Sequence, residues 1–259
     1  MPFSQPDTVR YYTFEMFDEL PVTQAMFTRQ GGVSPVPWDS LNTGATVGDN
    51  PLRVGENRRR AFTAVNRNLD SMYDAWQVHS ATVVCAKSPR GDAPHHKADA
   101  IITNNPDVTL FMRFADCVPI LLCDPNRDVV GIVHAGWLGT VRFVLQAAVE
   151  AMHAEFGSIP GDIYAGIGPS IGVHHYQVGE DVITRVEGAF GEDAPSLLQY
   201  VGGKVQFNLW ESNRLILERC GVKNIEVAEI CTACHLEDWY SHRGEQGQTG
   251  RFGGLICLK

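Results

Sequence analysis

Short runs of β-branched and aromatic residues recur along the whole chain and predict strands. Most of the runs are apolar at nearly every position, as in strands that are covered on both faces. The predicted strands span residues 81–87, 109–114, 118–123, 129–134, 163–167, 225–230 and 254–258. Layers of helix or a second sheet are therefore expected on either side of them.

Three helices are predicted, over residues 56–69, 138–156 and 211–220. In the second, apolar residues repeat at steps of three and four, and polar residues fall opposite. The apolar stripe is Val141, Leu145, Ala148, Met152 and Phe156, and the polar face is Arg142, Gln146, Glu150 and His153. Because several strands follow one another too closely for helical crossovers, we expect an α/β fold of mixed β-sheets layered with helices.

Composition indicates one ordinary folded domain. The 259 residues suffice for a full hydrophobic core, and no repeat, low-complexity segment or linker divides them. A hydrophobic content of 44% and a charged content of 20% are typical of a soluble globular protein. We therefore expect a single domain over residues 1–259.

The charge and cysteine content narrow the function. A formal net charge of −9 argues against nucleic-acid binding, because phosphate backbones recruit clustered Lys and Arg, so a small-molecule substrate fits better. No signal peptide and no apolar run long enough for a membrane span is recognised, so a cytoplasmic location without a membrane partner is expected. The seven cysteines are expected to be reduced thiols or metal ligands rather than a disulfide framework.

Three residues near predicted strand ends could bind a metal ion. His79, Cys117 and His134 offer the donor atoms that zinc prefers, and three protein ligands leave a fourth position open for catalysis. Their spacing matches no local metal motif, so three buried core residues are the alternative. The small pair Ala135-Gly136 would let the backbone turn sharply beside something else, which favours a cleft.

Six motifs, in order and spacing, resemble the laccase-domain or polyphenol-oxidase-like family of purine nucleoside phosphorylases. They are SLNTGATVGDNPLRVGENR, QVHS, ADCVPILLCDP, VGIVHAGWLGT, IGPSIG and YSHRGEQGQTGR. The resemblance covers nearly the whole chain. It implies a single-domain fold of the α-β-β-α type related to cysteine-hydrolase-like folds, and a zinc site formed by His79, Cys117 and His134.

The resemblance also implies an activity. Family members are described as cytosolic, often monomeric enzymes that phosphorolyse adenosine, inosine, guanosine and methylthioadenosine and that deaminate adenosine. The expected partners are therefore nucleosides and inorganic phosphate. Our hypothesis is that zinc activates water for deamination and orients phosphate for phosphorolysis.

Phosphate requires cationic donors, and arginine matches its geometry best. The candidates within the family-like motifs are Arg29, Arg58, Arg243 and Arg251. Asn42 could orient ribose or phosphate. The alternatives are solvated surface arginines and an asparagine that only forms a turn.

Two positions leave alternatives open. The family usually reads HAGWRGT, whereas this chain has Leu138 at the arginine position; Arg142, one turn further on, could replace that arginine or simply face solvent. Asp116 could act as a catalytic acid or base. Because neighbours in a strand point to opposite faces, it reaches the site of Cys117 only if the backbone bends, and it could instead support the ligands.

Two further motifs are discounted. The G-x-S-x-G at residues 168–172 lacks a following helix, so a glycine-rich turn is preferred to a nucleophile elbow. The C-x-x-C-H at residues 231–235 is interpreted as reduced thiols at a strand end, with a redox pair or a second metal site as the alternative to haem attachment. Nine histidines are too few for a multicopper oxidase.

Two other functions remain open. The main rival is a cysteine hydrolase or amidase in which Cys117 is the nucleophile and His134 its base, with cell-wall precursors as the substrates, a role attributed to some relatives. In the third, the chain is a zinc-stabilised scaffold that binds a partner. Metal content and thiol alkylation separate the first two, and loss of folding on chelation without nucleoside turnover identifies the third.

Overall fold

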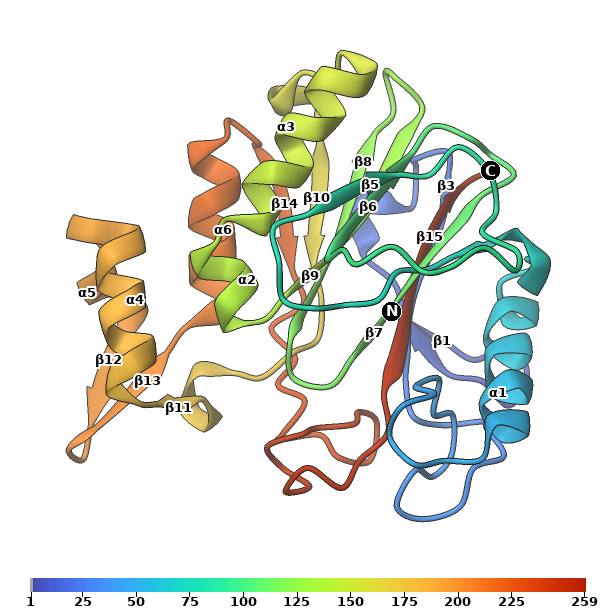
Figure 1. The fold of residues 1–259 in the computed structure, drawn as a ribbon, viewed down its shortest axis with the longest axis horizontal. Coiled ribbons are helices and arrows are strands. Elements are labelled where there is room, and N and C mark those ends of the chain that lie inside the picture. Colours follow the sequence, from blue (N-terminus) through green and yellow to red (C-terminus); the bar gives the residue numbers. More distant parts are fainter. Residues whose placement is uncertain (1) are drawn as a thin grey trace.

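Two six-stranded mixed sheets form the centre of the protein (Figure 1). In this computed structural model, which describes residues 2–259, every neighbouring pair of strands in the first sheet is antiparallel except β7 and β4, which are parallel. The order of this sheet is β1 (Phe3–Ser4), β2 (Tyr11–Tyr12), β3 (Val22–Phe27), β15 (Phe252–Leu258), β7 (Thr109–Phe114) and β4 (Met72–Tyr73).

The second sheet is antiparallel at its centre and parallel at both edges. Its order is β14 (Asn224–Val227), β10 (Tyr164–Ile167), β8 (Val118–Asp124), β9 (Val129–Ala135), β6 (Ala100–Thr103) and β5 (Val83–Cys85). The two sheets are joined directly where β7 ends and β8 begins. Mixed sheets are therefore confirmed.

The apolar runs are continuous because each central strand is covered on both of its faces. In β8, Leu121 and Cys123 face the core between the two sheets, whereas Ile120 and Leu122 face the helices. Helix α1 (Pro51–Ala64) covers the outer face of the first sheet, and α2 (Trp137–Val141), α3 (Val144–Phe156) and α6 (Leu209–Arg219) cover that of the second (Figure 1). The expected α-β-β-α layering is confirmed, whereas the cysteine-hydrolase-like relationship stays a prediction.

The predicted helix over residues 138–156 is wrong as one continuous element. Helix α2 ends at Val141 and α3 begins at Val144, because Phe143 between them adopts a left-handed conformation with φ of 58°. Of the predicted apolar stripe, Leu145, Ala148 and Met152 are buried in α3, and Val141, before the break, is partly buried against the same core.

A side unit packs beside α2 and was not predicted. It contains the small sheet β11 (Gln177–Val178), β13 (Lys204–Phe207) and β12 (Leu198–Val201), with α4 (Glu180–Phe190) and α5 (Ala194–Leu197) (Figure 1). Single turns of 3-10 helix lie at Glu15–Phe17, Leu69–Ser71, Pro160–Asp162, Val173–His175 and Gly191–Asp193. None of the helices within residues 2–259 is long and apolar enough to cross a bilayer.

Candidate active site

The three predicted metal ligands come from three separate connections. Cys117 lies in the short link between β7 and β8, His134 lies near the end of β9, and His79 lies in the loop between β4 and β5. Their ligand atoms all lie within 4.8 Å of one another, and Cys117 Sγ is 3.8 Å from His79 Nε2. The fold therefore brings together one thiol and two imidazoles that are distant in the sequence.

Asp99 organises this group, and the sequence analysis missed it. Its Oδ1 lies 2.9 Å from Nδ1 of His134, and its Oδ2 accepts hydrogen bonds from the backbone N–H of Ser80 at 2.6 Å and of Val78 at 3.2 Å. One buried carboxylate thus orients His134 and also holds both neighbours of His79. With Nδ1 of His134 engaged, Nε2 is left to bind a metal.

The backbone at His79 adopts an uncommon conformation that the surroundings hold in place. Its φ of 58° is left-handed, which costs a non-glycine residue about 1 kcal/mol or more. Besides the contacts from Asp99, Arg142 donates from Nη1 to the carbonyl oxygen of His79 at 2.9 Å. Arg142 is not among the residues that line the cleft. Its side chain instead contacts the loop that carries His79.

Gly136 explains the small residues after His134. A Cβ at this position would lie 2.8 Å from Cys117 Sγ and 3.0 Å from His79 Cδ2. The backbone therefore passes directly against two of the three candidate ligand side chains, as the Ala135-Gly136 pair predicted. Any side chain at position 136 would push the donor atoms apart.

The electrostatics favour an ionised thiol. Burial opposes ionisation of Cys117, but the neighbouring His134 and His79 outweigh it and lower the pKa of the thiol well below its ordinary value. Burial likewise opposes the charged form of His134, but Cys117 and Asp99 raise its pKa. The thiolate is the form that both a metal ion and a nucleophilic mechanism require.

The three residues open into a cleft of ≈ 570 Å³. Seventeen residues line it: Gly44, Ala45, Thr46, Arg58, Trp76, Gln77, His79, His95, Arg113, Ala115, Asp116, Cys117, His134, Tyr176, His242, Arg243 and Arg251. The cleft contains both apolar rings and guanidinium groups. Its volume is within the range of small-molecule sites.

Three of the predicted arginines lie in the cleft without a carboxylate partner within 4 Å in the described chain. Arg58 uses only Nε, which donates to the carbonyl of Thr43 at 2.9 Å. Burial, together with the charge of Arg113, lowers the pKa of Arg58 to about 10, so it stays charged at neutral pH. Arg243 and Arg251 bond to backbone carbonyls only. The cleft of this acidic protein is thus suited to an anion.

Arg113 also lines the cleft and was missed. It donates from Nη1 to Asp74 at 2.6 Å, and Asp74 also binds Arg90 at 2.7 Å and His95 at 3.1 Å. This buried carboxylate neutralises part of the nearby positive charge. The signal in the sequence was a single arginine within the otherwise apolar run of β7.

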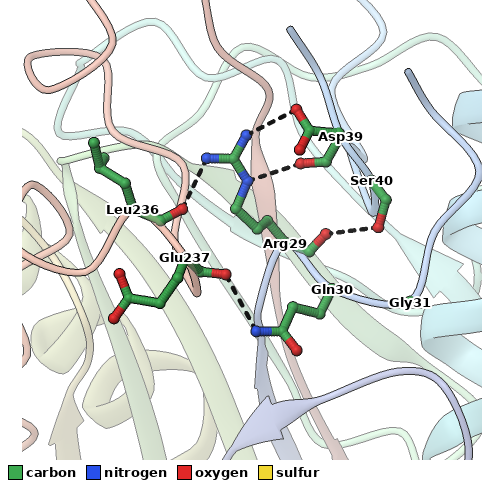
Figure 2. Close-up of a pocket in the computed structure, with 7 residues that line it drawn as sticks. All are labelled: Arg29, Gln30, Gly31, Asp39, Ser40, Leu236 and Glu237. Carbon is green, nitrogen blue, oxygen red and sulfur yellow. Dashed lines mark hydrogen bonds and ion pairs between the residues drawn. The ribbon is translucent and has the colours of Figure 1, made fainter. Parts of the chain in front are cut away.

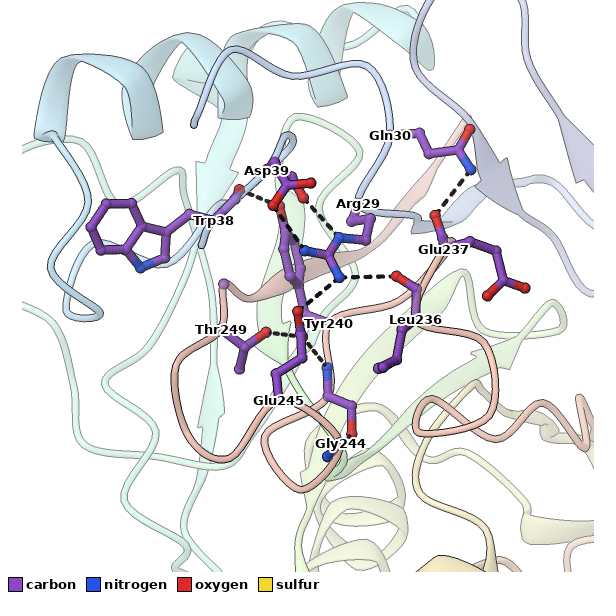
Figure 3. Close-up of polar contacts among 12 residues, drawn as sticks. Arg29, Gln30, Trp38, Asp39, Leu236, Glu237, Tyr240, Gly244, Glu245 and Thr249 are labelled. Carbon is purple, nitrogen blue, oxygen red and sulfur yellow. Dashed lines mark hydrogen bonds and ion pairs between the residues drawn. The ribbon is translucent and has the colours of Figure 1, made fainter. Parts of the chain in front are cut away.

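Arg29 and Asn42 lie outside the cleft, although both were predicted to bind substrate. Arg29 lines a separate hollow of ≈ 310 Å³ and donates to the carbonyls of Asp39 and Leu236 (Figure 2). It also pairs with Glu245 at 2.9 Å and lies over the ring of Tyr240 (Figure 3). All of these contacts tie together loops of the protein itself.

Asn42 is fully buried and bonds to its own loop and to the backbone of Arg251. Its Nδ2 donates to Asp49 at 2.9 Å, and its Oδ1 accepts from the backbone N–H of Gly44 and of Arg251, each at 2.9 Å. The turn-forming alternative describes it better than contact with ribose. It places Arg251 indirectly, through the backbone.

Asp116 borders the cleft, but its carboxylate is already satisfied. The backbone does bend there, with φ of 81°. Oδ1 accepts from the hydroxyls of Thr232 and Ser241, each at 2.7 Å, and Oδ2 accepts from the backbone N–H of Arg243 at 2.6 Å. This arrangement supports a positioning role, in which Asp116 anchors the loop that carries Arg243.

The G-x-S-x-G segment forms a turn. Ser170 is fully buried, accepts a hydrogen bond from Trp210 Nε1 at 2.6 Å and lies outside the cleft. The residues after it form only the single turn Val173–His175. A nucleophile elbow is therefore excluded at this position.

Comparison with known proteins identifies the family. Residues 23–259 match the family model described as multi-copper polyphenol oxidoreductase laccase. The chain belongs to this family.

Within residues 2–259, His, Cys and carboxylate groups gather as a potential metal site at two places, the cleft and a cluster formed by His174, His175, Cys231 and Cys234.

Several relatives in this family have names that state an activity. The chain is 38% identical over 241 residues to the purine nucleoside phosphorylase YlmD of Bacillus subtilis, covering 90% of this chain and 87% of that protein. It is also 38% identical over 242 residues to the purine nucleoside phosphorylase of Deinococcus radiodurans, covering 92% and 90%. The crystal structure of YlmD from Geobacillus stearothermophilus has a TM-score of 0.93 at 32% identity, covering 100% of this chain and 99% of that one.

Proposed function

We propose that the protein is a zinc-dependent purine nucleoside phosphorylase that also deaminates adenosine, with adenosine, inosine, guanosine and methylthioadenosine as substrates. The observation that carries the proposal is the placement of a Cys/His/His donor set beside three arginines without carboxylate partners in one cleft. The names of the relatives agree with it.

The donor set suits a zinc ion that His79, Cys117 and His134 would hold. Thiolate and imidazole are ligands that zinc prefers, three protein ligands leave one position for a reactant, and Gly136 keeps the space beside them free. Bound there, zinc would supply Lewis-acid chemistry. Asp99 fixes His134 in the tautomer that presents Nε2.

The arginines of the cleft would bind the phosphate substrate. Arg58, Arg243 and Arg251 would hold its oxygens by charge-assisted hydrogen bonds, which are stronger in a partly desolvated cleft than in water. The rings of Tyr176 and Trp76 offer apolar faces for a purine base. Together these groups would position phosphate against C1′ of the ribose, and positioning is a large part of such a rate enhancement.

Product analysis tests this proposal. The zinc-loaded protein is incubated with each nucleoside, with and without inorganic phosphate, and the free base, the ribose phosphate and ammonia are quantified. We expect base release only with phosphate and ammonia release from adenosine in either condition. Absence of both products from every nucleoside would contradict the proposal.

A cysteine hydrolase is the second candidate, because Cys117, His134 and Asp99 also follow one another as nucleophile, base and orienting carboxylate do. The second imidazole, His79 at 3.8 Å from the same sulfur, favours the metal site, since a nucleophile needs one base only. A metal-free protein that hydrolyses amides and is inactivated by iodoacetamide would support the hydrolase instead.

A further inference from the structure

We propose that the protein has a second zinc site, a closed structural one, formed by His174, His175, Cys231 and Cys234. Their four ligand atoms all lie within 4.8 Å of one another. The site is separate from the cleft that contains Cys117, so its existence does not depend on the proposed activity.

Three of the six distances between the ligand atoms are close to those of tetrahedral coordination. Cys234 Sγ lies 3.1 Å from His174 Nε2 and 3.5 Å from His175 Nδ1, and Cys231 Sγ lies 3.5 Å from His175 Nδ1. A tetrahedral zinc ion with Zn–S of about 2.3 Å and Zn–N of about 2.0 Å separates its ligand atoms by roughly 3.3–3.8 Å. The side chains are thus close to where such an ion would hold them.

The local backbone brings each donor to the same point. The two histidines are adjacent in the turn Val173–His175, and they direct different ring nitrogens inward, Nε2 from His174 and Nδ1 from His175. The two cysteines flank a turn in which the N–H of Cys234 donates to the carbonyl of Cys231 at 3.1 Å. This C-x-x-C spacing is common in zinc sites.

Gly172 lets the two ligand turns pack against each other. Its backbone N–H donates to Cys231 Sγ at 3.2 Å. A Cβ on Gly172 would lie 2.8 Å from His174 Cε1 and 3.1 Å from Cys231 Cβ, so only glycine allows the histidine turn to pack so closely on the cysteine turn. Two thiolates with two imidazoles are a donor set for zinc rather than for magnesium or calcium.

Four protein ligands leave no position for a reactant, so the role is structural. The site would join residues 174–176 to residues 231–234. The first segment carries Tyr176, which lines the cleft, and the second carries Thr232, which donates to Asp116 at 2.7 Å. A metal here would therefore brace one wall of the cleft.

Metal stoichiometry tests the proposal. Zinc-replete protein is purified with reductant and dialysed. The number of zinc ions per chain is then measured by elemental mass spectrometry. We expect two zinc ions per chain in the wild type, one in Cys117→Ser, one in Cys234→Ser and one in His174→Ala. The matched control is Cys220→Ser, a cysteine outside both clusters, which should keep two.

A second measurement isolates the site from the cleft and from folding defects. In Cys117→Ser, cobalt should produce thiolate-to-cobalt charge-transfer absorption, and a chelator should lower the melting temperature. Both effects should vanish in Cys117→Ser/Cys234→Ser/Cys231→Ser that retains the wild-type circular dichroism. Absence of zinc from Cys117→Ser, two zinc ions in Cys234→Ser, or a Cys231–Cys234 disulfide under reducing conditions would overturn the proposal.

Discussion

The carboxylate of Asp99 lies 2.9 Å from Nδ1 of His134, which links a buried acid to one of the three proposed metal ligands. The same carboxylate binds the backbone on both sides of His79. Burial opposes its ionisation, but hydrogen bonds from His134 and Ser80 lower the pKa of Asp99 to about 2. It is therefore charged at neutral pH and positions both His134 and the loop of His79.

Replacing Asp99 should weaken metal binding more than it weakens the fold. Asp99→Asn removes the charge that holds His134 in one tautomer, so we expect zinc affinity to fall about 10- to 100-fold. Chelator competition measures it, on protein whose metal-free melting temperature is recorded in parallel. Asp107→Asn, at an exposed position, is the control and should bind zinc as the wild type does. An unchanged affinity in Asp99→Asn would refute the role assigned to Asp99.

Gly136→Ala should disrupt the metal site by steric overlap. The added Cβ would lie 2.8 Å from Cys117 Sγ, so the thiol or the backbone must shift. We expect the cleft to lose its zinc while the chain stays folded, measured by metal analysis and circular dichroism. Gly188→Ala in α4, where nothing lies within 4 Å of the new Cβ, serves as the control. Full zinc content in Gly136→Ala would show that the ligands lie elsewhere.

Arg58 should contribute to phosphate binding and not to deamination. Loss of a charge-assisted contact of about 1.5–3 kcal/mol should raise the KM for phosphate at least about tenfold in Arg58→Ala. The phosphate-independent release of ammonia from adenosine should stay within about twofold of the wild type. Arg53→Ala, an exposed arginine on the same helix, should change neither quantity. A KM unchanged by Arg58→Ala would remove Arg58 from the site.

The buried Asp74 should make stability depend on acid pH. Burial opposes its ionisation, but Arg113 and Arg90 lower the pKa of this carboxyl from 3.8 to about 2. A pKa lower in the folded state contributes stability above the unfolded value, near 4, and that stability is lost as the pH falls towards 2. The contribution is about 2 kcal/mol.

Urea unfolding between pH 6 and 2 in the presence of a chelator measures this term. The wild type should lose about 2 kcal/mol more unfolding free energy over this range than Asp74→Asn, in which the titrating group is absent. Parallel pH profiles for the two proteins would contradict the assignment.

The pattern of apolar residues predicted the central strands well, and β7 was predicted at its observed bounds, Thr109–Phe114. The break before α3 was not predicted, because Phe143 is neither glycine nor proline and its left-handed conformation leaves the apolar period intact. Strands β3 and β6 were missed, although β6 is no shorter than β10, which was predicted. Local periodicity cannot report such tertiary effects.

The grouping of His79, Cys117 and His134 follows from the resemblance rather than from their spacing. His79 and Cys117 are 38 residues apart and come from different connections, so no local rule joins them. Asp99 was missed because a single aspartate before a buried strand carries no motif. Arg29 and Asn42 were assigned to substrate because polar residues in a motif do not reveal whether they face a cleft or the protein interior.

The central claim is that His79, Cys117 and His134 share one metal ion in the cleft. Anomalous diffraction at the zinc absorption edge, from crystals of zinc-replete protein, tests it most directly. We predict a peak in contact with His79 Nε2, Cys117 Sγ and His134 Nε2, with one coordination position open to the cleft. No peak between these three atoms in fully zinc-loaded protein would contradict the claim.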